Sequence, residues 1–582
     1  MKGAEEMAKE QREISVSEFF EKNRHLLGYD NKAKALLMIV KEGVDNALDA
    51  TEEAGILPEL YVSVRQLAEE KYEIIIKDNG PGIVEKQIPR IFGKLLYGSK
   101  FHRLKQNRGQ QGIGISAATL YTQLTTGEPL EIVSSIGNGK LYKYKIKIDV
   151  RKNEPITTDS MTGERDKIAE WVVRGESDNN GSWRGTQLRF VTEGIYRGYK
   201  QSIPEYIRQT AIANPHAKII FMSPDNEENV YERAIDLMPK EAKEIMPHLH
   251  GVELGVFTRM LRDTKAKTFA SFLTSEFTKV GRKTAKAICA KAGIEETRKP
   301  RKITDEEIRK TMEAIKTVKL LKPPTDCLSP LGEHVIKESL KKEFSPEWID
   351  AVTRPPEVYR GWPFQVEVGI AYAGGASEPR MMRFANRVPL LYQQGDCAIT
   401  KSIAGVEWRR YGLANFMKSA AENPDPVAVF VHVVSVWVPF TSESKEAIAS
   451  YPVIIKEIKL ALQECGRKLG LYLSGKRRSE YHHHRMLTFE KYAGETAKAL
   501  SELTDEEKEE IKKHLFDLIN SKNYKSTEEE DGGTEKAEGA GEKGSEADRK
   551  EGKPKAGAAR QVTIEHILRR EKRPDTARGQ EE

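Results

Sequence analysis

Three polar side chains share one face of a segment that otherwise has the pattern of a buried helix. Residues 35–50 are apolar at helical spacing, yet Glu42, Asn46 and Asp49 follow one another at intervals of four and three residues. They therefore project from the same side, and if that side is buried each needs a partner. A nucleotide with its metal ion and a water molecule would supply such partners. A solvated stripe on an amphipathic helix explains the same spacing.

A second segment places a carboxylate at the end of a predicted strand. The β-branched run from Tyr72 to Lys77 is followed by Asp78, Gly80 and Gly82. At the edge of a sheet, Asp78 could accept a hydrogen bond from an exocyclic amine, and the glycines would let the backbone approach a flat ring closely. An ordinary strand-to-turn corner is the alternative, because Asp-Asn-Gly-Pro-Gly is strong turn chemistry.

A third segment is a glycine-rich loop that leads into a helical pattern of small residues. Its members are Arg108, Gly109, Gln110, Gln111, Gly112, Ile113, Gly114, Ile115 and Ser116. Bare N–H groups at a helix N-terminus form a phosphate cradle. The run formally fits a dinucleotide-binding fingerprint, but that fingerprint needs a strand directly before it, and residues 103–108 are polar and basic. We therefore predict a phosphate loop outside a Rossmann fold.

Two later segments have the appearance of ligand sites. Residues 470–477 resemble a P-loop, but Arg477 stands where the metal-binding Ser or Thr belongs, and we interpret them as a loop with a basic end. The adjacent histidines His482, His483 and His484 could indicate a metal site. Because adjacent side chains diverge in direction, we interpret that run as a basic segment facing DNA or a partner.

The first three segments, in this order, resemble the GHKL ATPase superfamily, which includes type II topoisomerases, heat-shock chaperones, MutL-type repair proteins and histidine kinases. The resemblance implies an α/β sandwich, the Bergerat fold, that holds ATP and Mg²⁺ under a flexible lid. It also implies roles for particular residues. Glu42 matches the general base that activates water, Asn46 the magnesium ligand, and Asp78 the adenine-binding carboxylate.

Further cofactor-binding residues follow from the same resemblance. Gly80 and Gly82 lie beside the adenine, and the loop from Arg108 to Ser116 binds the phosphates. Thr186, just before a predicted strand over residues 187–191, supports Asp78. The segment 84–108 is rich in Lys, Arg, Gln and Gly, and we interpret it as the ATP lid. It would hold Ser99 and Lys100 near the phosphates, although a plain solvated lysine is the alternative for Lys100.

Length indicates a protein of several domains, and the resemblance implies that it is an α+β protein. A chain of 582 residues exceeds what one hydrophobic core supports, and about three domains are expected. No apolar run could span a bilayer, and residues 1–11 lack the apolar core of a secretory signal. The four cysteines are scattered without metal-ligand spacing. We expect a cytoplasmic protein without a membrane partner, and the resemblance implies that it is nucleoid-associated. The net charge of +6 does not by itself require nucleic acid.

The chain is predicted to divide into four parts. Residues 1–230 form the ATPase domain with an N-terminal strap, residues 231–305 a small helical domain, residues 306–520 a transducer domain, and residues 521–582 a disordered tail. The tail mixes Gly, Lys, Glu and Ala and cannot bury a core. Within it, residues 561–570 form a short amphipathic helix candidate, either a docking peptide or a frayed end.

The helical part carries a basic helix start at Arg282, Lys283 and Lys286. Cations and backbone amides at such a place can hold a nucleic-acid backbone, and the segment resembles a helix-two-turns-helix module. A helical spacer with a solvated basic face explains it equally well.

The transducer part combines strands with a crossover helix. Residues 364–372 and 427–438 are predicted strands, the second nearly apolar throughout and so buried on both faces, and residues 452–469 are a predicted helix. Strands with a βαβ crossover resemble the transducer domain of GHKL topoisomerases. That resemblance implies that Lys445, in the loop after the buried strand, reaches the terminal phosphate and takes part in catalysis. A surface lysine at a helix start is the alternative.

Nucleotide domain, helical insert and transducer in this order resemble the B subunits of archaeal type IIB topoisomerases, DNA topoisomerase VI, over residues 15–520. A histidine kinase would place its nucleotide domain last, and a heat-shock chaperone lacks the insert. A gyrase-type subunit would add an Asp-x-Asp pair, which this sequence lacks. No tyrosine stands out as a nucleophile. The resemblance therefore implies a separate A subunit that carries the cleavage tyrosine.

The implied activity is that of an ATP-driven clamp. The chain would homodimerise on ATP within an A2B2 heterotetramer and pass one double-stranded DNA through a break in another, relaxing supercoils and decatenating DNA. Two other classes stay open: an ATP-dependent chaperone-type clamp, and a non-cleaving, DNA-bridging GHKL protein.

Overall fold

A computed structural model describes Met7 and residues 13–100, 103–109, 112–137, 140–157, 183–199, 201–373, 379–416, 425–504 and 506–518. The chain forms two compact units, Met1–Arg478 and Ser479–Glu582. The second contains the C-terminal part of helix α14 (Pro452–Thr504). The predicted tail, residues 521–582 with its short helix, lies outside the described residues. Every helix in the described part is too short or too polar to cross a membrane.

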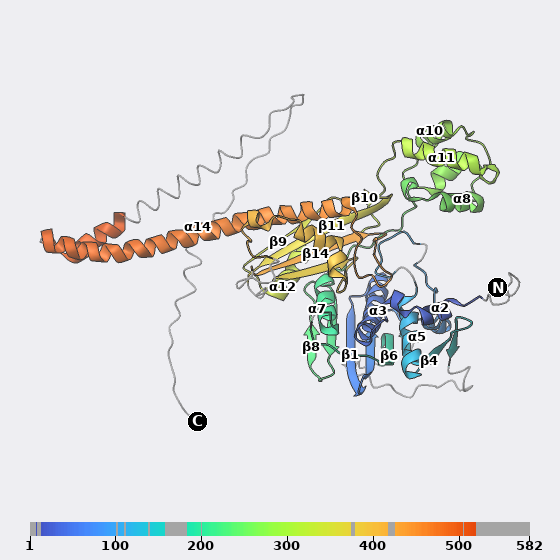
Figure 1. The fold of residues 1–582 in the computed structure, drawn as a ribbon, viewed down its shortest axis with the longest axis horizontal. Coiled ribbons are helices and arrows are strands. Elements are labelled where there is room, and N and C mark those ends of the chain that lie inside the picture. The colour runs from blue at the N-terminus through green and yellow to red at the C-terminus, as the bar shows by residue number, and fades with distance from the viewer. Residues whose placement is uncertain are drawn as a thin grey trace. The chain divides into compact units, whose positions relative to one another are not determined.

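An eight-stranded sheet forms the base of the first unit (Figure 1). Its order is β5-β4-β3-β6-β2-β1-β7-β8, and every neighbouring pair is antiparallel except β1 with β7. The strands are β1 (Glu59–Ala68), β2 (Lys71–Asp78), β3 (Leu130–Ile136), β4 (Tyr142–Asp149), β5 (Glu154–Thr157), β6 (Arg184–Glu193), β7 (Lys218–Met222) and β8 (Glu228–Tyr231).

A hydrophobic core lies between this sheet and its helices. The helices of this part are α2 (Val16–Lys22), α3 (Lys32–Glu53), α4 (Ile88–Gly93), α5 (Gly114–Thr126) and α7 (Ile203–Ala213). Helix α3 begins where the Asn31 side chain accepts a hydrogen bond from the Lys34 N–H, 2.8 Å away, because a helix start leaves N–H groups without partners. The helix predicted over residues 35–50 is confirmed and is longer at both ends.

A small helical module follows, and its core contains four helices: α8 (Leu254–Asp263), α9 (Phe269–Glu276), α10 (Arg282–Ala292) and α11 (Asp305–Thr317). This confirms the prediction of a small helical part. Ile308 and Ile315 of α11 are buried in the same cluster as Phe257 and Phe272. We therefore propose that this domain ends near residue 320 instead of 305, because a boundary at 305 would cut through one core.

A second sheet has the order β10-β11-β14-β12-β13, with β9 paired to β11. Its strands are β9 (Trp348–Thr353), β10 (Glu357–Tyr359), β11 (Trp362–Tyr372), β12 (Arg380–Ala385), β13 (Val388–Pro389) and β14 (Val427–Ser435). Strand β14 is buried along its whole length, as predicted. Strands β12 and β14 are parallel, and the chain between them contains α13 (Ala398–Ala404), which confirms the βαβ crossover.

Both faces of the second sheet are covered. Alternate residues of β14 pack in two different clusters, one with α13 and the start of α14, the other with α12 (Glu333–Phe344). The second cluster also contains Ile212 and Ala213 of α7, so the first sheet's helical layer contacts the second sheet directly. This contact fixes the transducer beside the ATPase fold.

The prediction of a loop at residues 470–477 is wrong. These residues lie inside α14. Leu469 and Leu473, one helical turn apart, are buried in the core of the second sheet, and this tertiary packing outweighs the weak helix propensity of Gly470 and Gly475.

Candidate nucleotide-binding site

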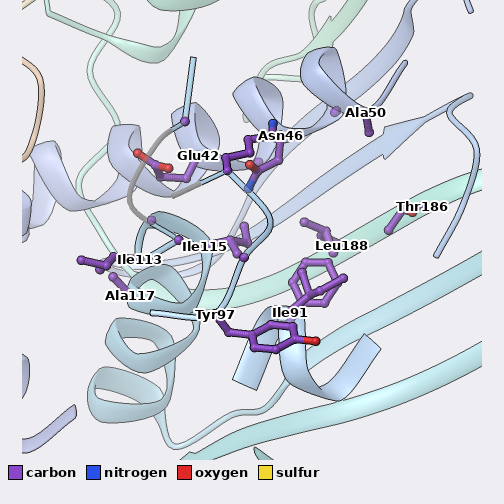
Figure 2. Close-up of a pocket in the computed structure, with 18 of the residues that line it drawn as sticks. Glu42, Asn46, Ala50, Ile91, Tyr97, Ile113, Ile115, Ala117, Thr186 and Leu188 are labelled. Carbon is purple, nitrogen blue, oxygen red and sulfur yellow. The ribbon is translucent and has the colours of Figure 1, made fainter. Parts of the chain in front are cut away.

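A cavity of about 580 Å³ opens beside α3, within the range of small-molecule sites. Figure 2 shows Glu42 and Asn46 on α3, Ile113 and Ile115 at the start of α5, and Thr186 on β6 around this space. The predicted site residues that line it are Glu42, Asn46, Asp78, Gly82, Ser99, Lys100, Gly109, Gly112, Ile113, Gly114, Ile115, Thr186 and Lys445. Gln110 and Gln111 lie outside the described residues.

The α3 wall presents a carboxylate and an amide one turn apart. A Glu42 oxygen lies 3.5 Å from the Lys41 ammonium. Burial opposes the charge of Lys41, but Asp45 and Glu42 outweigh it and raise the pKa of Lys41. Asn46 is exposed, and within the described part of the chain its amide makes no hydrogen bond. Its oxygen is thus available to a ligand.

Asp78 lies at the end of β2, as predicted. One carboxylate oxygen, Oδ1, accepts the N–H of Gly80 at 2.8 Å and the N–H of Thr186 at 3.1 Å. Oδ2 is left for a ligand. Burial raises the pKa of Asp78 to about 6, although the two N–H groups act in the opposite direction. Glycine is required at position 185, because a Cβ there would lie 2.1 Å from the Asp78 carbonyl oxygen.

The N-terminus of α5 closes the other end of the cavity. Ile113, the residue before this helix, gives no side-chain cap, so with respect to the described residues the first N–H groups of α5 are open to an anion. A Cβ on Gly114 would lie 1.8 Å from a Glu42 carboxylate oxygen. Only glycine therefore lets the start of α5 approach the carboxylate this closely.

Lys445 enters the cavity from the loop after β14. Its ammonium donates to the carbonyl oxygen of Arg108, 2.9 Å away. Burial and the nearby Lys41 lower the pKa of Lys445, while Glu42 opposes this shift. An ion pair between Glu446 and Lys34 holds the same loop against α3. A residue of the transducer thus reaches the nucleotide domain's cavity.

Some predicted phosphate ligands are engaged elsewhere. The Lys100 ammonium lies 2.6 Å from Asp49, and the Arg108 guanidinium lies 2.8 Å from Asp49 and 2.6 Å from Glu52. The Arg108 guanidinium is therefore directed away from the cavity, whereas the Arg108 carbonyl contacts Lys445, which lines the cavity. The Ser116 hydroxyl donates to the Ile113 carbonyl, one turn back in its own helix.

Several lining residues were missed from the sequence. Tyr29, Gln87, Ile91 and Tyr97 all line the cavity, and the Tyr97 hydroxyl donates to Gln87 at 2.6 Å. The position of Tyr97, two residues before Ser99 in the predicted lid, was a usable signal. Gln87 and Ile91 lie in the same predicted lid, residues 84–108, whereas nothing local marks Tyr29, which reaches the cavity through the fold.

No cluster of three or more His, Cys, Asp or Glu side chains in the described residues could hold a metal ion. The run His482–His484 therefore forms no such site there. A magnesium ion needs less from the protein, because it keeps several waters and takes few protein ligands. The amide oxygen of Asn46, in the same cavity as the start of α5, fits that requirement.

The fold and cavity define a GHKL-type ATPase domain joined to a transducer. Residues 31–151 match the family described as histidine kinase-, DNA gyrase B- and HSP90-like ATPase, and residues 323–485 match the topoisomerase VI B-subunit transducer. The first match implies that the chain binds ATP.

Whole-chain relatives are more specific. The chain is 47% identical over 476 residues to the B subunit of type 2 DNA topoisomerase 6 from Methanococcoides burtonii, covering 81% of this chain and 74% of the relative. It is 39% identical over 570 residues to the protein of that name from Pyrococcus horikoshii, covering 90% and 97%. The chain therefore belongs to the family of type 2 DNA topoisomerase 6 B subunits.

Proposed function

We propose that this chain is the ATP-binding and ATP-hydrolysing B subunit of a type IIB DNA topoisomerase, an isomerase. One observation carries the proposal. Glu42, Asn46, Asp78 and Lys445, contributed by the ATPase fold and the transducer, line the same cavity. The family membership of the whole chain supports the same conclusion.

The site residues act in different parts of the reaction. Oδ2 of Asp78 accepts a hydrogen bond from the exocyclic amine of adenine, and the N–H groups at the start of α5 bind the phosphates. Glu42 accepts a proton from the water that attacks the terminal phosphate. Asn46 would hold Mg²⁺, which would neutralise phosphate charge there.

Lys445 couples hydrolysis to movement. Its ammonium is a compact charge suited to binding a terminal phosphate. In the structure this ammonium donates a hydrogen bond to the Arg108 carbonyl instead. Exchange of that carbonyl for a phosphate oxygen would move the loop after β14 and the transducer with it. Such a movement would separate the two ends of a cleaved duplex.

The partners follow from the same proposal. Two copies associate on ATP through their nucleotide domains, and the N-terminal strap exposes Ile14, Phe19 and Leu26, as an interaction surface would. An A subunit with the cleavage tyrosine completes an A2B2 heterotetramer on double-stranded DNA, associated with the nucleoid.

Co-purification from the source tests the assignment together with an ATPase assay. The proposal predicts that a tyrosine-bearing cleavage protein accompanies the chain, and that duplex DNA stimulates ATP turnover. Client refolding without DNA dependence would instead identify a chaperone-type clamp. ATP binding with negligible turnover and no cleavage protein would identify a DNA-bridging protein.

A further inference from the structure

The three residues Gln106–Arg108 connect the lid to the phosphate loop and are held from several sides. The Gln106 N–H donates to the Cys327 carbonyl at 3.0 Å, and its side-chain oxygen accepts the Ser329 N–H at 2.6 Å. Both partners lie in the chain that leads from the helical module into the transducer. We call residues 106–108 the joint.

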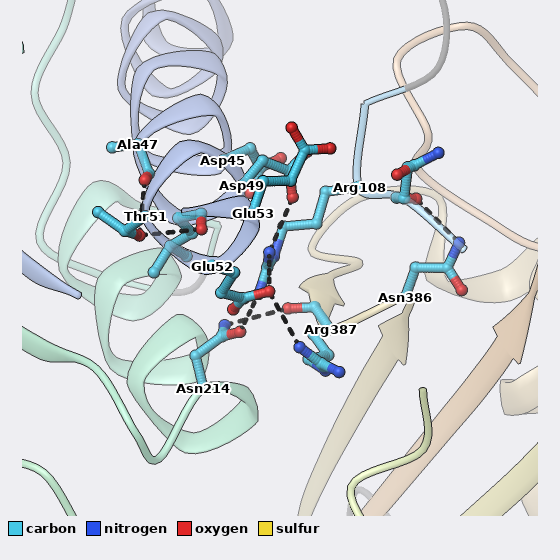
Figure 3. Close-up of polar contacts among 12 residues, drawn as sticks. Asp45, Ala47, Asp49, Thr51, Glu52, Glu53, Arg108, Asn214, Asn386 and Arg387 are labelled. Atoms are coloured by element: carbon cyan, nitrogen blue, oxygen red, sulfur yellow. Dashed lines mark hydrogen bonds and ion pairs between the residues drawn. The ribbon is translucent and has the colours of Figure 1, made fainter. Parts of the chain in front are cut away.

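Arg108 fastens the joint to the nucleotide domain. Its guanidinium bonds to Asp49 and Glu52 at the end of α3 and to Asn214 after α7 (Figure 3). Burial alone would raise the pKa of the Glu52 carboxyl. The positive charges of Arg108 and Arg387 outweigh burial and hold this pKa well below its usual range. The cluster is therefore ionised, and the Arg108 carbonyl that binds Lys445 has a defined position.

The transducer holds the joint through the turn between β12 and β13. The Asn386 amide donates to the Asn107 carbonyl at 3.0 Å, and the Arg387 guanidinium donates to Glu52 at 3.1 Å and to the Ser329 carbonyl at 3.0 Å. Figure 3 shows Asn386 and Arg387 reaching from the second sheet toward α3 and Arg108. One short turn thus contacts the joint and also the group of charged side chains formed by Arg108, Asp49 and Glu52, which we call the ion cluster.

The same turn is anchored in the core of the second sheet. The Arg387 N–H donates to Nε2 of His432 at 2.9 Å, and Nδ1 of His432 lies 2.8 Å from Glu367. Because Nε2 accepts, the proton of the neutral ring is on Nδ1 and is donated to Glu367. Burial lowers the pKa of His432, which keeps Nε2 an acceptor.

The backbone of this turn is strained. The φ angle is 47° at Asn386 and 66° at Arg387. Residues other than glycine rarely adopt such positive values. Both residues are buried, with 5% and 4% of their surface exposed. Such conformations persist when the surrounding contacts demand them. Here the hairpin itself demands them, because Ala385 of β12 pairs with Val388 of β13 and a two-residue hairpin turn of this kind needs positive φ at both positions.

We propose that Asn386 and Arg387 are positioning residues for ATP hydrolysis, because they fix the Arg108 carbonyl, which holds Lys445 at the cavity that Glu42 also lines until the terminal phosphate replaces that carbonyl. Arg387 and Lys445 both belong to the transducer. Lys445 donates to the Arg108 carbonyl directly, whereas Arg387 binds Glu52, which in turn binds the Arg108 guanidinium. A shift of the turn therefore displaces the carbonyl that holds Lys445. The inference rests on the proposed function, since it concerns the regulation of that same site.

The test compares Arg387→Ala and Arg387→Lys with Arg354→Ala in the full chain. Arg354 pairs with Glu457 at 3.3 Å, within the transducer and away from the joint, so it is a control for losing an arginine that forms an ion pair, although its side chain is more exposed than that of Arg387. We expect Arg387→Ala to lower kcat for ATP about tenfold, with KM changed by less than about twofold, because misplacement affects the reacting geometry and not nucleotide binding. Arg387→Lys keeps the charge but not the fork that reaches two partners, so its kcat should be intermediate.

A double-mutant cycle with Lys445→Ala separates positioning from general stability. If Arg387 acts through Lys445, the double variant has the kcat of Lys445→Ala alone, whereas Arg354→Ala combined with Lys445→Ala shows independent effects. Asn386→Gly tests the same point without strain, because glycine accepts positive φ but lacks the amide. It should lower kcat; because the Asn386 amide also bonds to the Ser435 backbone, its loss should lower the melting temperature as well, so kcat is measured well below that temperature, and the variant remains informative if Arg387→Ala does not fold.

Additive effects of Arg387→Ala and Lys445→Ala, or unchanged kcat in both Arg387→Ala and Asn386→Gly, would overturn the inference. Absence of ATP turnover in the wild-type chain, or unchanged turnover in Lys445→Ala, would overturn the proposed function and the inference with it. The two failures therefore have different signatures.

Discussion

At the residue scale, Glu42 occupies a confined position. Lys41 lies beside its carboxylate, and the bare backbone of Gly114 packs against it. Confinement of this kind favours a base that must hold one water in line with a phosphate.

We predict that Glu42→Gln binds ATP as the wild type does but loses turnover by a factor of about 100 to 10,000, the usual contribution of a general base. The amide keeps the shape of the side chain and cannot accept the proton. ATP binding measured by calorimetry, beside a steady-state ATPase assay, checks both parts. Wild-type turnover in this variant would remove Glu42 from the role of base.

Asp78 predicts a pH dependence of nucleotide affinity. Its pKa of about 6 means that the carboxylate takes up a proton as pH falls through 6, and a protonated oxygen no longer accepts freely from the adenine amine. We expect ATP affinity to fall about tenfold between pH 7 and pH 5, because roughly one site in ten stays ionised one unit below the pKa.

Asp78→Asn is the control for that measurement. The amide does not titrate, so the variant should bind weakly with a flatter pH profile, and whatever slope remains belongs to the phosphates of the nucleotide. Parallel profiles for wild type and Asp78→Asn would refute the assignment of Asp78 as the titrating group.

At the element scale, α3 serves two regions with two sets of side chains. Glu42 and Asn46 line the cavity, whereas Asp49 and Glu52, further along the helix, bind Lys100, Arg108 and Arg387. One helix therefore carries residues of both the cavity wall and the ion cluster, so a displacement of the helix at one of these regions moves the residues of the other.

The start of α5 gives a prediction for an element boundary. We expect Gly114→Ala to reduce ATP turnover at least about tenfold, because its Cβ would displace either Glu42 or the helix N-terminus. Gly255→Ala is the matched control, since nothing lies within 4 Å of a Cβ placed there. Equal kcat values for these two variants would contradict the proposed close approach.

At the scale of the whole molecule, the ATPase fold and transducer share a hydrophobic contact and a polar one. Ile212 and Ala213 of α7 pack with Leu340 of α12 and Phe430 of β14, and Lys445 reaches Arg108 across the same boundary. The apolar contact can act as a pivot, while the polar one responds to charge in the cavity.

We therefore predict that Lys445→Ala loses ATP hydrolysis and DNA relaxation together when assayed with the cleavage protein. The variant should retain nucleotide binding, because Asp78 and the α5 N-terminus remain. Supercoil relaxation measured on a gel, beside ATP consumption in the same reactions, checks this coupling. Full relaxation by Lys445→Ala would exclude a sensing role for this lysine.

Much of the ATPase fold could be predicted from local patterns. The α3 helix and the β2 strand ending at Asp78 have periodicities and turn residues that identify them, and so does the fully buried β14 of the transducer. The loop predicted at residues 470–477 failed because its glycines were weighed without the tertiary partner of Leu473. The boundary after the helical module was hard to place for a related reason: α11 joins a core formed by helices that precede it.

By itself, the sequence determined which residue types stand at which spacing, and hence the family and the candidate base, metal ligand and adenine carboxylate. Only the tertiary structure decided that Arg108 directs its charge away from the cavity, that Lys100 pairs with Asp49, and that Asn386 and Arg387 hold the joint. Spacing along one helix or strand is set by local geometry. Contacts between segments hundreds of residues apart depend on how whole sheets pack, and no local pattern encodes them.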